Sequence, residues 1–224
     1  MAPSRSARPT PDREPLTRQR VLTAAVALAD ELGLDHLSMR RLGEALGVEA
    51  MSIYNHVANK DALLDGMVDA VFAEIEVPGV EVGWRAAMTT RARSAREALR
   101  RHRWAIGLLD SRTSPGLETL QHHDRVLGVL RGDGFPLPLA AHAFALLDSY
   151  TYGFAVQEAA LPFEGPEETA DVTGAMVEQM PVDELPHLAE MATDHVLQPG
   201  YAFGDEFEWG LELVLDGLER ALRA

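Results

Sequence analysis

Residues 37–60 read LSMRRLGEALGVEAMSIYNHVANK, which is the pattern of two short helices separated by a glycine turn. Ser38 is a suitable N-cap for the first helix, and Gly47 supplies the backbone freedom that ends it. The second helix is expected over residues 49–56, and Asn59 caps the helix that follows. Because so short a pair is not stable alone, its residues must serve either a local core or a groove of another molecule.

The side chains of this pair divide between an inner and an outer face. Those expected to form a small local core are Leu42, Ala45, Leu46, Val48, Ile53 and Val57. Those expected to face outward are Ala50, Met51, Ser52, Tyr54, Asn55 and His56. Short polar and aromatic side chains on an exposed helix are typical of a surface that contacts DNA, so the segment predicts a helix-turn-helix.

The segment closely resembles the helix-turn-helix of the tetracycline-repressor (TetR) family. The residues that carry the resemblance are Arg40, Leu42, Ala45, Leu46, Gly47, Val48, Ser52, Tyr54, His56, Val57, Asn59, Lys60, Leu63 and Leu64. In that family the second helix enters the major groove by its N-terminal residues. The DNA-binding set that the resemblance implies is Ser38, Arg40, Ala50, Met51, Ser52, Tyr54, Asn55, His56 and Lys60.

The resemblance assigns different roles within this set. Arg40 would approach a base or a phosphate, and Lys60 would meet a phosphate at a helix N-terminus. The residues expected to hold the DNA backbone are Ser52, Tyr54 and His56. Because Ala50 and Met51 cannot donate paired hydrogen bonds, base reading would depend on thymine methyl groups, on Arg40 and on DNA shape.

The formal net charge of −15 is distributed unevenly along the chain. Residues 1–60 contain 8 Lys and Arg against 7 Asp and Glu, residues 61–131 contain 10 of each, and residues 132–224 contain 2 against 18. DNA attraction depends on the local field at the contacting face, so a near-neutral head with exposed cations can bind although the rest is acidic. Affinity for DNA is expected to be modest and sensitive to salt.

Helical periodicity predicts an all-α chain, with an N-terminal three-helix helix-turn-helix head joined to a C-terminal helical ligand-binding and dimerisation body. We expect a disordered basic arm over residues 1–15, a DNA-binding domain over 16–77 and the body over 78–224. The helices expected outside the motif are 17–32, 60–75, 84–101, 104–109, 115–131, 138–160, 182–193 and 205–222. Most of the polar stretch 162–181 is interpreted as a mobile loop.

The helices 138–160 and 205–222 match in position the two that form a four-helix dimer interface in the family. The apolar seam of the last helix consists of Phe207, Leu211, Val214, Leu215, Leu218 and Leu222. A seam on a terminal helix needs a partner to leave water, which favours a homodimer. The alternative is that both seams close the core of a single chain.

The body should bind an unidentified small molecule. The apolar residues that could line its cavity are Met88, Trp104, Leu108, His123, Phe144, Leu147, Tyr150 and Phe154, and Gln157 and Glu158 stand where family members place polar ligand contacts. Asp148 lies on an otherwise apolar helix, where it must either pair with an arginine or face the cavity. Because the chain beyond residue 131 carries a net charge of −16 and Asp148 and Glu158 lie on the expected cavity helix, we expect a neutral or cationic ligand that lowers DNA affinity.

Other classes of function have little support. The chain has no cysteine, and no phosphate-binding loop, nucleophile elbow or dinucleotide-binding glycine run, so neither an enzyme nor a cofactor is expected. His122 and His123 are adjacent on a helix and cannot chelate one metal ion together, so no metal site is predicted. A regulator that acts without a ligand remains the alternative within the DNA-binding class.

Two further interpretations concern charge and location. The arginines of residues 85–103 are interpreted as a solvated face with ion pairs rather than as a nucleic-acid patch. The N-terminal stretch lacks the apolar run of a signal peptide, and no segment reaches membrane-spanning length. We therefore expect a cytoplasmic protein that binds double-stranded operator DNA and has no membrane partner.

Overall fold

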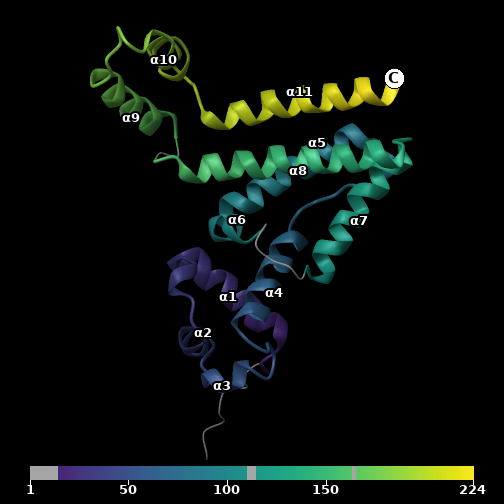
Figure 1. Cartoon of the computed structure of the whole chain (residues 1–224). Helices are drawn as coiled ribbons and strands as arrows, with labels where there is room; N and C mark the ends of the chain where they lie inside the picture. Colours follow the sequence, from purple (N-terminus) through teal and green to yellow (C-terminus); the bar gives the residue numbers. More distant parts are fainter. Residues whose placement is uncertain (1–14, 110–114, 163–164) are drawn as a thin grey trace, which may run out of the picture. The chain divides into compact units, whose positions relative to one another are not determined.

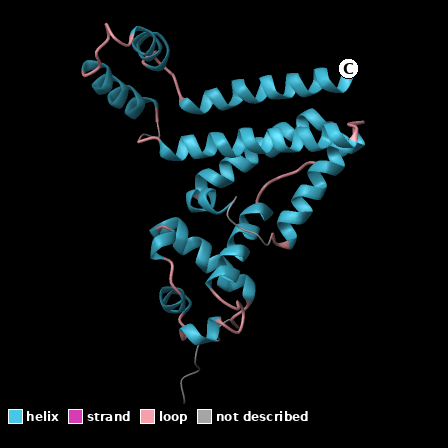
Figure 2. Cartoon of the chain, viewed as in Figure 1, coloured by secondary structure: helices cyan, strands magenta, loops and turns pink. Residues whose placement is uncertain are grey.

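The computed structural model describes residues 15–109, 115–162 and 165–224, and its regular elements in these ranges are helices (Figure 2). The expected all-α fold is confirmed. The chain divides into two compact units, Met1–Met67 and Val68–Ala224, with the division inside one continuous helix. Except for its last residue, the predicted basic arm lies outside the described residues.

The first unit contains the helix-turn-helix (Figure 1). Its helices are α1 (Arg18–Leu32), α2 (Met39–Leu46), α3 (Ala50–Ile53) and the first half of α4 (Lys60–Ala73). A single 3₁₀ turn, Leu34–His36, joins α1 to α2.

The predicted helix ends are confirmed by their hydrogen bonds. The Ser38 hydroxyl accepts a bond from the backbone N–H of Arg41 at 3.2 Å, and the Asn59 side chain accepts one from Ala62 at 2.8 Å. Gly47 ends α2 with φ 68° and ψ 32°, a left-handed conformation that favours glycine.

The local core of this unit forms largely as expected. Leu42, Leu46, Ile53 and Val57 are buried. Ala45 is exposed and the prediction for it is wrong, because it lies on the outer side of a helix with a single buried stripe.

Gly43 has a role that the apolar pattern did not indicate. A Cβ atom there would lie 2.8 Å from the Val48 carbonyl oxygen. Glycine is therefore required for α2 to approach the start of α3.

The second unit continues α4 and adds seven helices among the described residues. These are α5 (Trp84–Arg101), α6 (Arg103–Leu109), α7 (Leu117–Gly132), α8 (Leu137–Ala160), α9 (Pro166–Glu178), α10 (Pro186–Met191) and α11 (Phe203–Arg223). A 3₁₀ turn, Val80–Val82, precedes α5, and a short π-helical turn, Ala192–Val196, follows α10.

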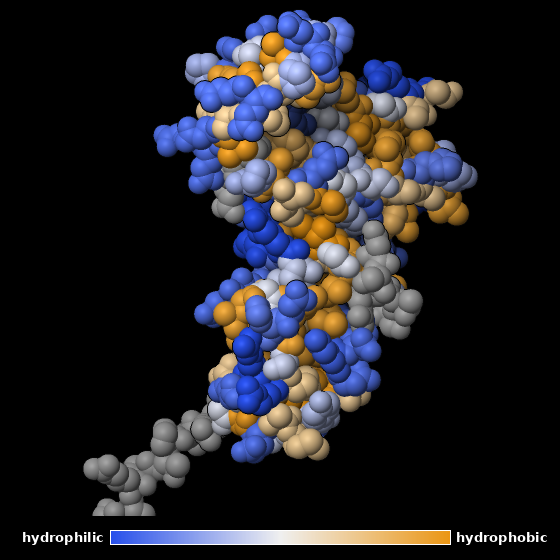
Figure 3. Space-filling view, turned by 60° about the vertical axis from the view of Figure 1, so that its left-hand side comes forward, coloured by the Kyte–Doolittle hydropathy of each residue, from blue (hydrophilic) through white to orange (hydrophobic). Residues whose placement is uncertain are grey.

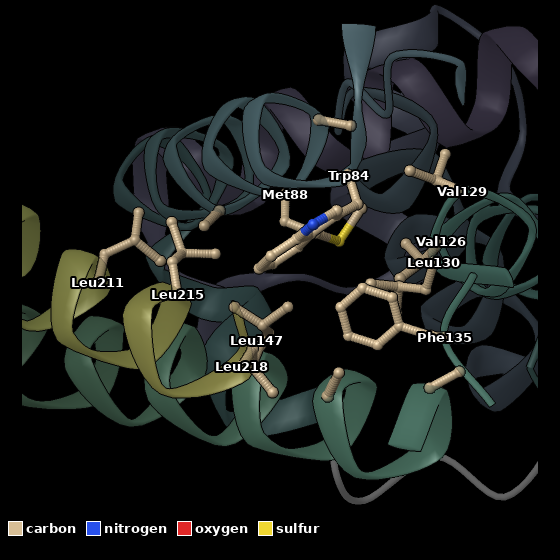
Figure 4. Packing of buried hydrophobic residues seen from close by; sticks show 14 of the residues in the cluster. Trp84, Met88, Val126, Val129, Leu130, Phe135, Leu147, Leu211, Leu215 and Leu218 are labelled. Carbon is tan, nitrogen blue, oxygen red and sulfur yellow. The ribbon is translucent and has the colours of Figure 1, made fainter. Parts of the chain in front are cut away.

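The main core of this unit lies where α5, α7, α8 and α11 meet. The long helices α8 and α11 run side by side (Figure 1). In Figure 4, Trp84, Met88 and Phe135 pack between the helices near Leu147, while Leu211, Leu215 and Leu218 come from α11. Trp84 and Phe135 meet edge to face with ring centroids 5.0 Å apart.

The apolar seam of α11 packs within its own chain. Phe207, Leu211, Leu215 and Leu218 are all buried in the main core. For these residues the alternative holds, in which the seam closes the core of a single chain. An interface between chains therefore requires a different face of α11.

The prediction of a mobile loop over most of 162–181 is wrong, because α9 occupies residues 166–178. Its start has the signals of a helix N-terminus, with Pro166 in the first turn followed by Glu167 and Glu168. The polar composition of the segment obscured these signals. The helix expected over 182–193 is shorter, since α10 begins at Pro186.

Ion pairs between α5 and α11 neutralise much of the acidic C-terminal helix. The Arg85 guanidinium lies 2.5 Å from Glu212 and 2.8 Å from Asp216, and Arg93 lies 2.6 Å from Glu208. The interpretation of the arginine run as a face with ion pairs is therefore confirmed for these residues. No helix among the described residues is long and apolar enough to cross a membrane.

Candidate functional site

The outer face of α3 presents the side chains expected to approach DNA. Met51 is 74% exposed and Tyr54 is 42% exposed, and Asn55 is also exposed. Ser52 and His56 are partly buried. These residues form one continuous surface because they occupy a single turn of helix and the turn that follows it.

The helix predicted over residues 49–56 is shorter in the structure. Regular α-helix covers Ala50–Ile53, and the chain then continues in turns, with the N–H of His56 donating to the Ile53 carbonyl oxygen at 2.8 Å. Ala50 lies at the start of α3 and is partly buried. In the predicted complex its small side chain would let the backbone come close to a groove, and Met51 would supply a large apolar contact.

The three remaining predicted DNA contacts lie at the start of α2 and at the start of α4. Arg40 is 82% exposed and lies 3.7 Å from Glu44 one turn later, a surface pair that is easily exchanged for a DNA contact. Lys60 is exposed at the first residue of α4. The Ser38 hydroxyl is engaged as the cap of α2, and the residue is exposed at the N-terminus of that helix.

Some of the effector-site residues predicted for the second unit form two groups, and the others belong to neither group. The first group surrounds Arg91, a fully buried arginine of α5. Its Nη2 lies 2.5 Å from Asp148 Oδ1 and donates to the Tyr152 hydroxyl at 3.3 Å, and its Nε donates to His122 Nε2 at 3.2 Å. Asp148 therefore pairs with an arginine, as one of its two interpretations expected.

His122 is held in its neutral form within this group. Burial lowers its pKa to about 3, and the neighbouring positive charge of Arg91 acts in the same direction. Because Nε2 accepts a bond from Arg91, the imidazole proton is on Nδ1. His123 is partly buried, and burial also lowers its pKa from the ordinary value, although the Asp148 carboxylate acts to raise it.

Aromatic rings form one wall of the Arg91 group. The Phe72 ring of α4 meets His122 and His123 edge to face, with centroids 5.4 and 5.7 Å apart. The His123 ring in turn meets Phe144 of α8 at 5.1 Å. The group therefore connects α4, α5, α7 and α8.

The second group is centred on Glu158 and Arg96. The Arg96 guanidinium donates to both carboxylate oxygens of Glu158, at 2.5 and 3.0 Å, and lies over the rings of Phe154 and Phe207 at 5.1 and 4.9 Å from their centroids. Tyr150 donates its hydroxyl to the Phe207 carbonyl oxygen at 2.9 Å.

A cavity of about 200 Å³ adjoins the second group. The residues that line it are Arg96, Arg100, Arg103, Glu158, Leu161, Gly165, Thr169, Ala202, Phe203 and Gly204. Three arginines against one glutamate make this lining positive. The expectation of a neutral or cationic ligand rested on the net charge of −16 beyond residue 131 and on Asp148 and Glu158. These two carboxylates are each paired with an arginine, so they do not support it, and the charge of the ligand stays a prediction.

The remaining predicted residues do not share a single cavity. Met88 and Leu147 are enclosed in the main core. Trp104 and Leu108 pack against a separate apolar cluster that also contains Phe72. Gln157 is exposed.

Two features of this region were missed from the sequence. Arg91 lies three residues after Met88 and four before Ala95, both buried, so helical spacing could have placed it on the inner face. Thr119 was not considered, although it bonds to Asp69 of α4. Among the described residues, no group of three or more His, Cys, Asp or Glu side chains is placed to hold a metal ion.

Two short helices, α2 and α3, lie on either side of a glycine turn, and the second of them is exposed. Together with the helical second unit, this arrangement defines a class of protein, the helix-turn-helix transcriptional regulators. Comparison with known families gives a more specific assignment. Residues 21–67 match the family described as bacterial regulatory proteins, tetR family, and residues 78–222 match the tetracyclin repressor-like C-terminal domain. The chain belongs to the TetR family and is a regulator, not an enzyme.

Individual relatives agree with this assignment over nearly the whole chain. The HTH-type transcriptional repressor DrrR1 of Streptomyces coeruleorubidus is 35% identical, with 97% of this chain and 80% of the relative covered. The tetracycline repressor protein class A from transposon 1721 of Escherichia coli is 34% identical, with 89% of each chain covered. The crystal structure of apo ActR from Streptomyces coelicolor is 30% identical with a TM-score of 0.77, and 93% of this chain and 97% of that chain are covered.

Proposed function

We propose that this chain is a homodimeric repressor that binds a pseudo-palindromic operator in the cytoplasm and is released from it by a small molecule bound in the second unit. Its relatives support this proposal, since two of them are named as repressors and ActR has been crystallised with actinorhodin. We place the DNA-binding domain at residues 16–77 and the effector-binding and dimerisation domain at 78–224, in agreement with the extents of the two family matches.

The observation that carries the proposal is the continuity of α4. The helix runs without a break from Lys60, a predicted phosphate contact, to Ala73. Near its end, Phe72 contacts both histidines of the Arg91 group, and Asp69 bonds to α7. A ligand that favours one arrangement of α4 in the second unit therefore changes the position of the first turn of the same helix.

The coupling that such a mechanism requires is modest. A ligand shifts an equilibrium only by the difference between its affinities for the two states. A coupling free energy of roughly 1 to 3 kcal/mol changes operator affinity by about 5- to 150-fold. A few contacts that differ between two positions of α4 are enough.

The proposed dimer interface is the outer face of α8 and α11. The main exposed apolar residues on this face are Leu146, Val156, Trp209 and Leu213, all at least 46% exposed. Small residues beside them, such as Gly153, allow helices to approach closely. Hydrophobic residues are visible among hydrophilic ones on the surface of the second unit in Figure 3. Such a surface favours association into a bundle with a second copy.

The test begins with selection of a binding site from random duplex DNA. We expect a palindromic sequence whose half-sites are roughly 34 to 36 Å apart. Ligands found by a thermal-shift screen are then added to the complex, and release of DNA is measured by fluorescence anisotropy. A monomeric protein that selects no palindrome contradicts the proposal. If a palindrome is selected but no compound weakens binding, the regulator acts without a ligand.

A further inference from the structure

Lys60 is the only lysine among the 20 lysine and arginine residues of the chain. The two side chains differ in reactivity, because a lysine amine can lose a proton and become a nucleophile, whereas the guanidinium of arginine stays protonated in proteins. A reagent that transfers an acyl group to a side-chain amine therefore has a single target here. Its reaction would change the charge at one defined position of the molecule.

The Lys60 side chain is open to such a reagent. Lys60 is exposed, and so are Ala58, Asn59 and Asp61 beside it. Among the residues that the structure describes, its ammonium group has neither an ion pair nor a hydrogen bond. The amine can therefore react without the loss of any contact that holds the first unit together.

Lys60 also lies where the proposed function needs positive charge. It is the first residue of α4, and the unpaired N–H groups of a helix N-terminus favour a phosphate nearby. Acylation replaces the ammonium by a neutral amide with a bulkier end. One phosphate contact is then lost from each subunit, and the bulkier side chain takes the space that the DNA backbone would occupy.

The contacts that hold the second unit together do not depend on an amine. The ion pairs of α5 with α11 are made by Arg85 and Arg93, and the buried partner of Asp148 is Arg91. Because guanidinium groups keep their protons, an acyl donor that modifies an amine leaves these pairs intact. Acylation of this chain therefore affects DNA binding while the fold is preserved.

We propose that Lys60 is acylated by an acyl phosphate and that the acylated protein has lost most of its affinity for the operator. This inference rests on the proposed function and adds a second form of regulation to it. An effector in the second unit acts on the DNA-binding face through the length of α4. Acylation acts directly at the residue expected to meet the phosphate.

The reaction is an acyl transfer without oxidation or reduction. The ammonium of Lys60 first releases one proton to solvent. The neutral amine then attacks the carbonyl carbon of the acyl phosphate, and a C–N bond forms as the bond between that carbon and the phosphate oxygen breaks. Phosphate leaves with the electron pair of the broken bond, and the nitrogen releases its second proton to solvent. The product is a neutral amide.

The test treats the full-length protein with acetyl phosphate and follows the reaction by mass spectrometry. We expect one acetyl group on Lys60 in addition to any at the amino terminus. Operator affinity should fall about tenfold or more, and the slope of log affinity against log salt should become shallower by about two units, because the proposed dimer loses one phosphate contact per subunit. The melting temperature should not change. Operator added before the treatment should protect Lys60 from acetylation.

Two variants serve as controls. Lys60→Arg has no side-chain amine, so its operator affinity is compared with its own value before treatment, and any decrease measures reaction at the amino terminus. The double variant Lys60→Arg/Arg125→Lys again contains a single lysine, at an exposed position of α7 in the second unit. It should take up one acetyl group, and its operator affinity should be the same before and after the treatment.

Two results overturn the inference. In the first, Lys60 takes up no acetyl group under conditions that modify the relocated lysine of the double variant. In the second, acetylated wild type keeps its operator affinity. Either result leaves the proposed function standing, provided that the unmodified protein selects an operator. If the unmodified protein selects no operator, the proposed function fails, and this inference fails with it.

Discussion

Asp69 Oδ1 accepts two hydrogen bonds from Thr119, one from its backbone N–H at 2.8 Å and one from its hydroxyl at 2.9 Å. Asp69 is on α4, and Thr119 is in the first turn of α7. The residue before α7 is Gly116, where a Cβ atom would collide with the Asp69 carboxyl group. Asp69 therefore takes the place of an N-cap side chain and brings a negative charge to a helix N-terminus.

We expect Asp69→Ala to weaken both stability and regulation. Removing the cap should lower the free energy of unfolding by about 0.5 to 2 kcal/mol, measured by urea denaturation. It should also reduce the change in operator affinity that an effector causes, because α4 and α7 are less firmly joined. Thr119→Ser keeps both bonds and should behave as wild type. An unchanged effector response in Asp69→Ala would show that this link does not carry the signal.

The local parts of the fold could be predicted because their signals are close in sequence. Ser38, Gly47 and Asn59 act within three or four residues of their own positions, and each was assigned correctly. The helix Trp84–Arg101 was also predicted with its observed ends. Capping and periodicity are properties of a single segment, so one sequence is enough to show them.

The tertiary partners could not be predicted in the same way. The α11 seam has the expected period, but period alone does not say whether its partner is α8 of the same chain or a second copy. Asp148 was recognised as needing a partner, yet Arg91 is 57 residues away and was counted among surface arginines. The expectation about effector charge relied in part on two carboxylates that are each paired with an arginine.

His122 should make the protein less stable at acidic pH. Its pKa is lowered from 6.5 to about 3 by burial and by the charges of Arg91, His123 and Arg125, whereas the unfolded chain binds a proton near pH 6.5. The unfolded state therefore holds more protons between these values. Stability contributed by neutral His122 is fully present above pH 6.5 and falls by about 1.4 kcal/mol for each pH unit below it.

The variant His122→Gln tests this effect, since it cannot be protonated. Its free energy of unfolding should decline less steeply than that of wild type between about pH 6.5 and 4.5, measured by urea denaturation at each pH. His142 is exposed on α8, and His142→Gln serves as the control with the wild-type slope. Parallel curves for wild type and His122→Gln would contradict the assignment of a buried neutral histidine.

Lys60→Ala should weaken binding to all DNA sequences to a similar degree. The residue is exposed at the start of α4, where ammonium and helix N-terminus would meet one phosphate. The slope of log affinity against log salt should become shallower by about one unit for each phosphate that the variant no longer neutralises. Filter binding over a series of salt concentrations measures the slope, and an unchanged slope would exclude an interaction of Lys60 with phosphate.

Arg40→Ala should instead change which sequences are preferred, if the guanidinium reaches a base edge. Its pair with Glu44 is exposed and contributes little, so the folded head should tolerate the change. Selection from random duplexes with wild type and variant compares their preferences directly. A uniform decrease in affinity with the same selected sequence would make Arg40 a phosphate-binding residue like Lys60.

Substitutions at two leucines of α11 should distinguish a residue that stabilises the core of the chain from a residue at the proposed contact between chains. Leu211 is completely buried, whereas Leu213, two residues later and on the opposite side of the helix, is 49% exposed. Leu213→Arg introduces a charge on the proposed interface and should give a monomer by analytical ultracentrifugation, with little change in unfolding free energy. The monomer should bind the operator more weakly, because the two half-sites are then bound independently.

Leu211→Ala should instead affect stability and not association. It should lower the unfolding free energy by about 2 to 5 kcal/mol through the cavity it leaves, while the folded fraction remains dimeric. If Leu213→Arg stays dimeric at micromolar concentration, the chains associate through another surface.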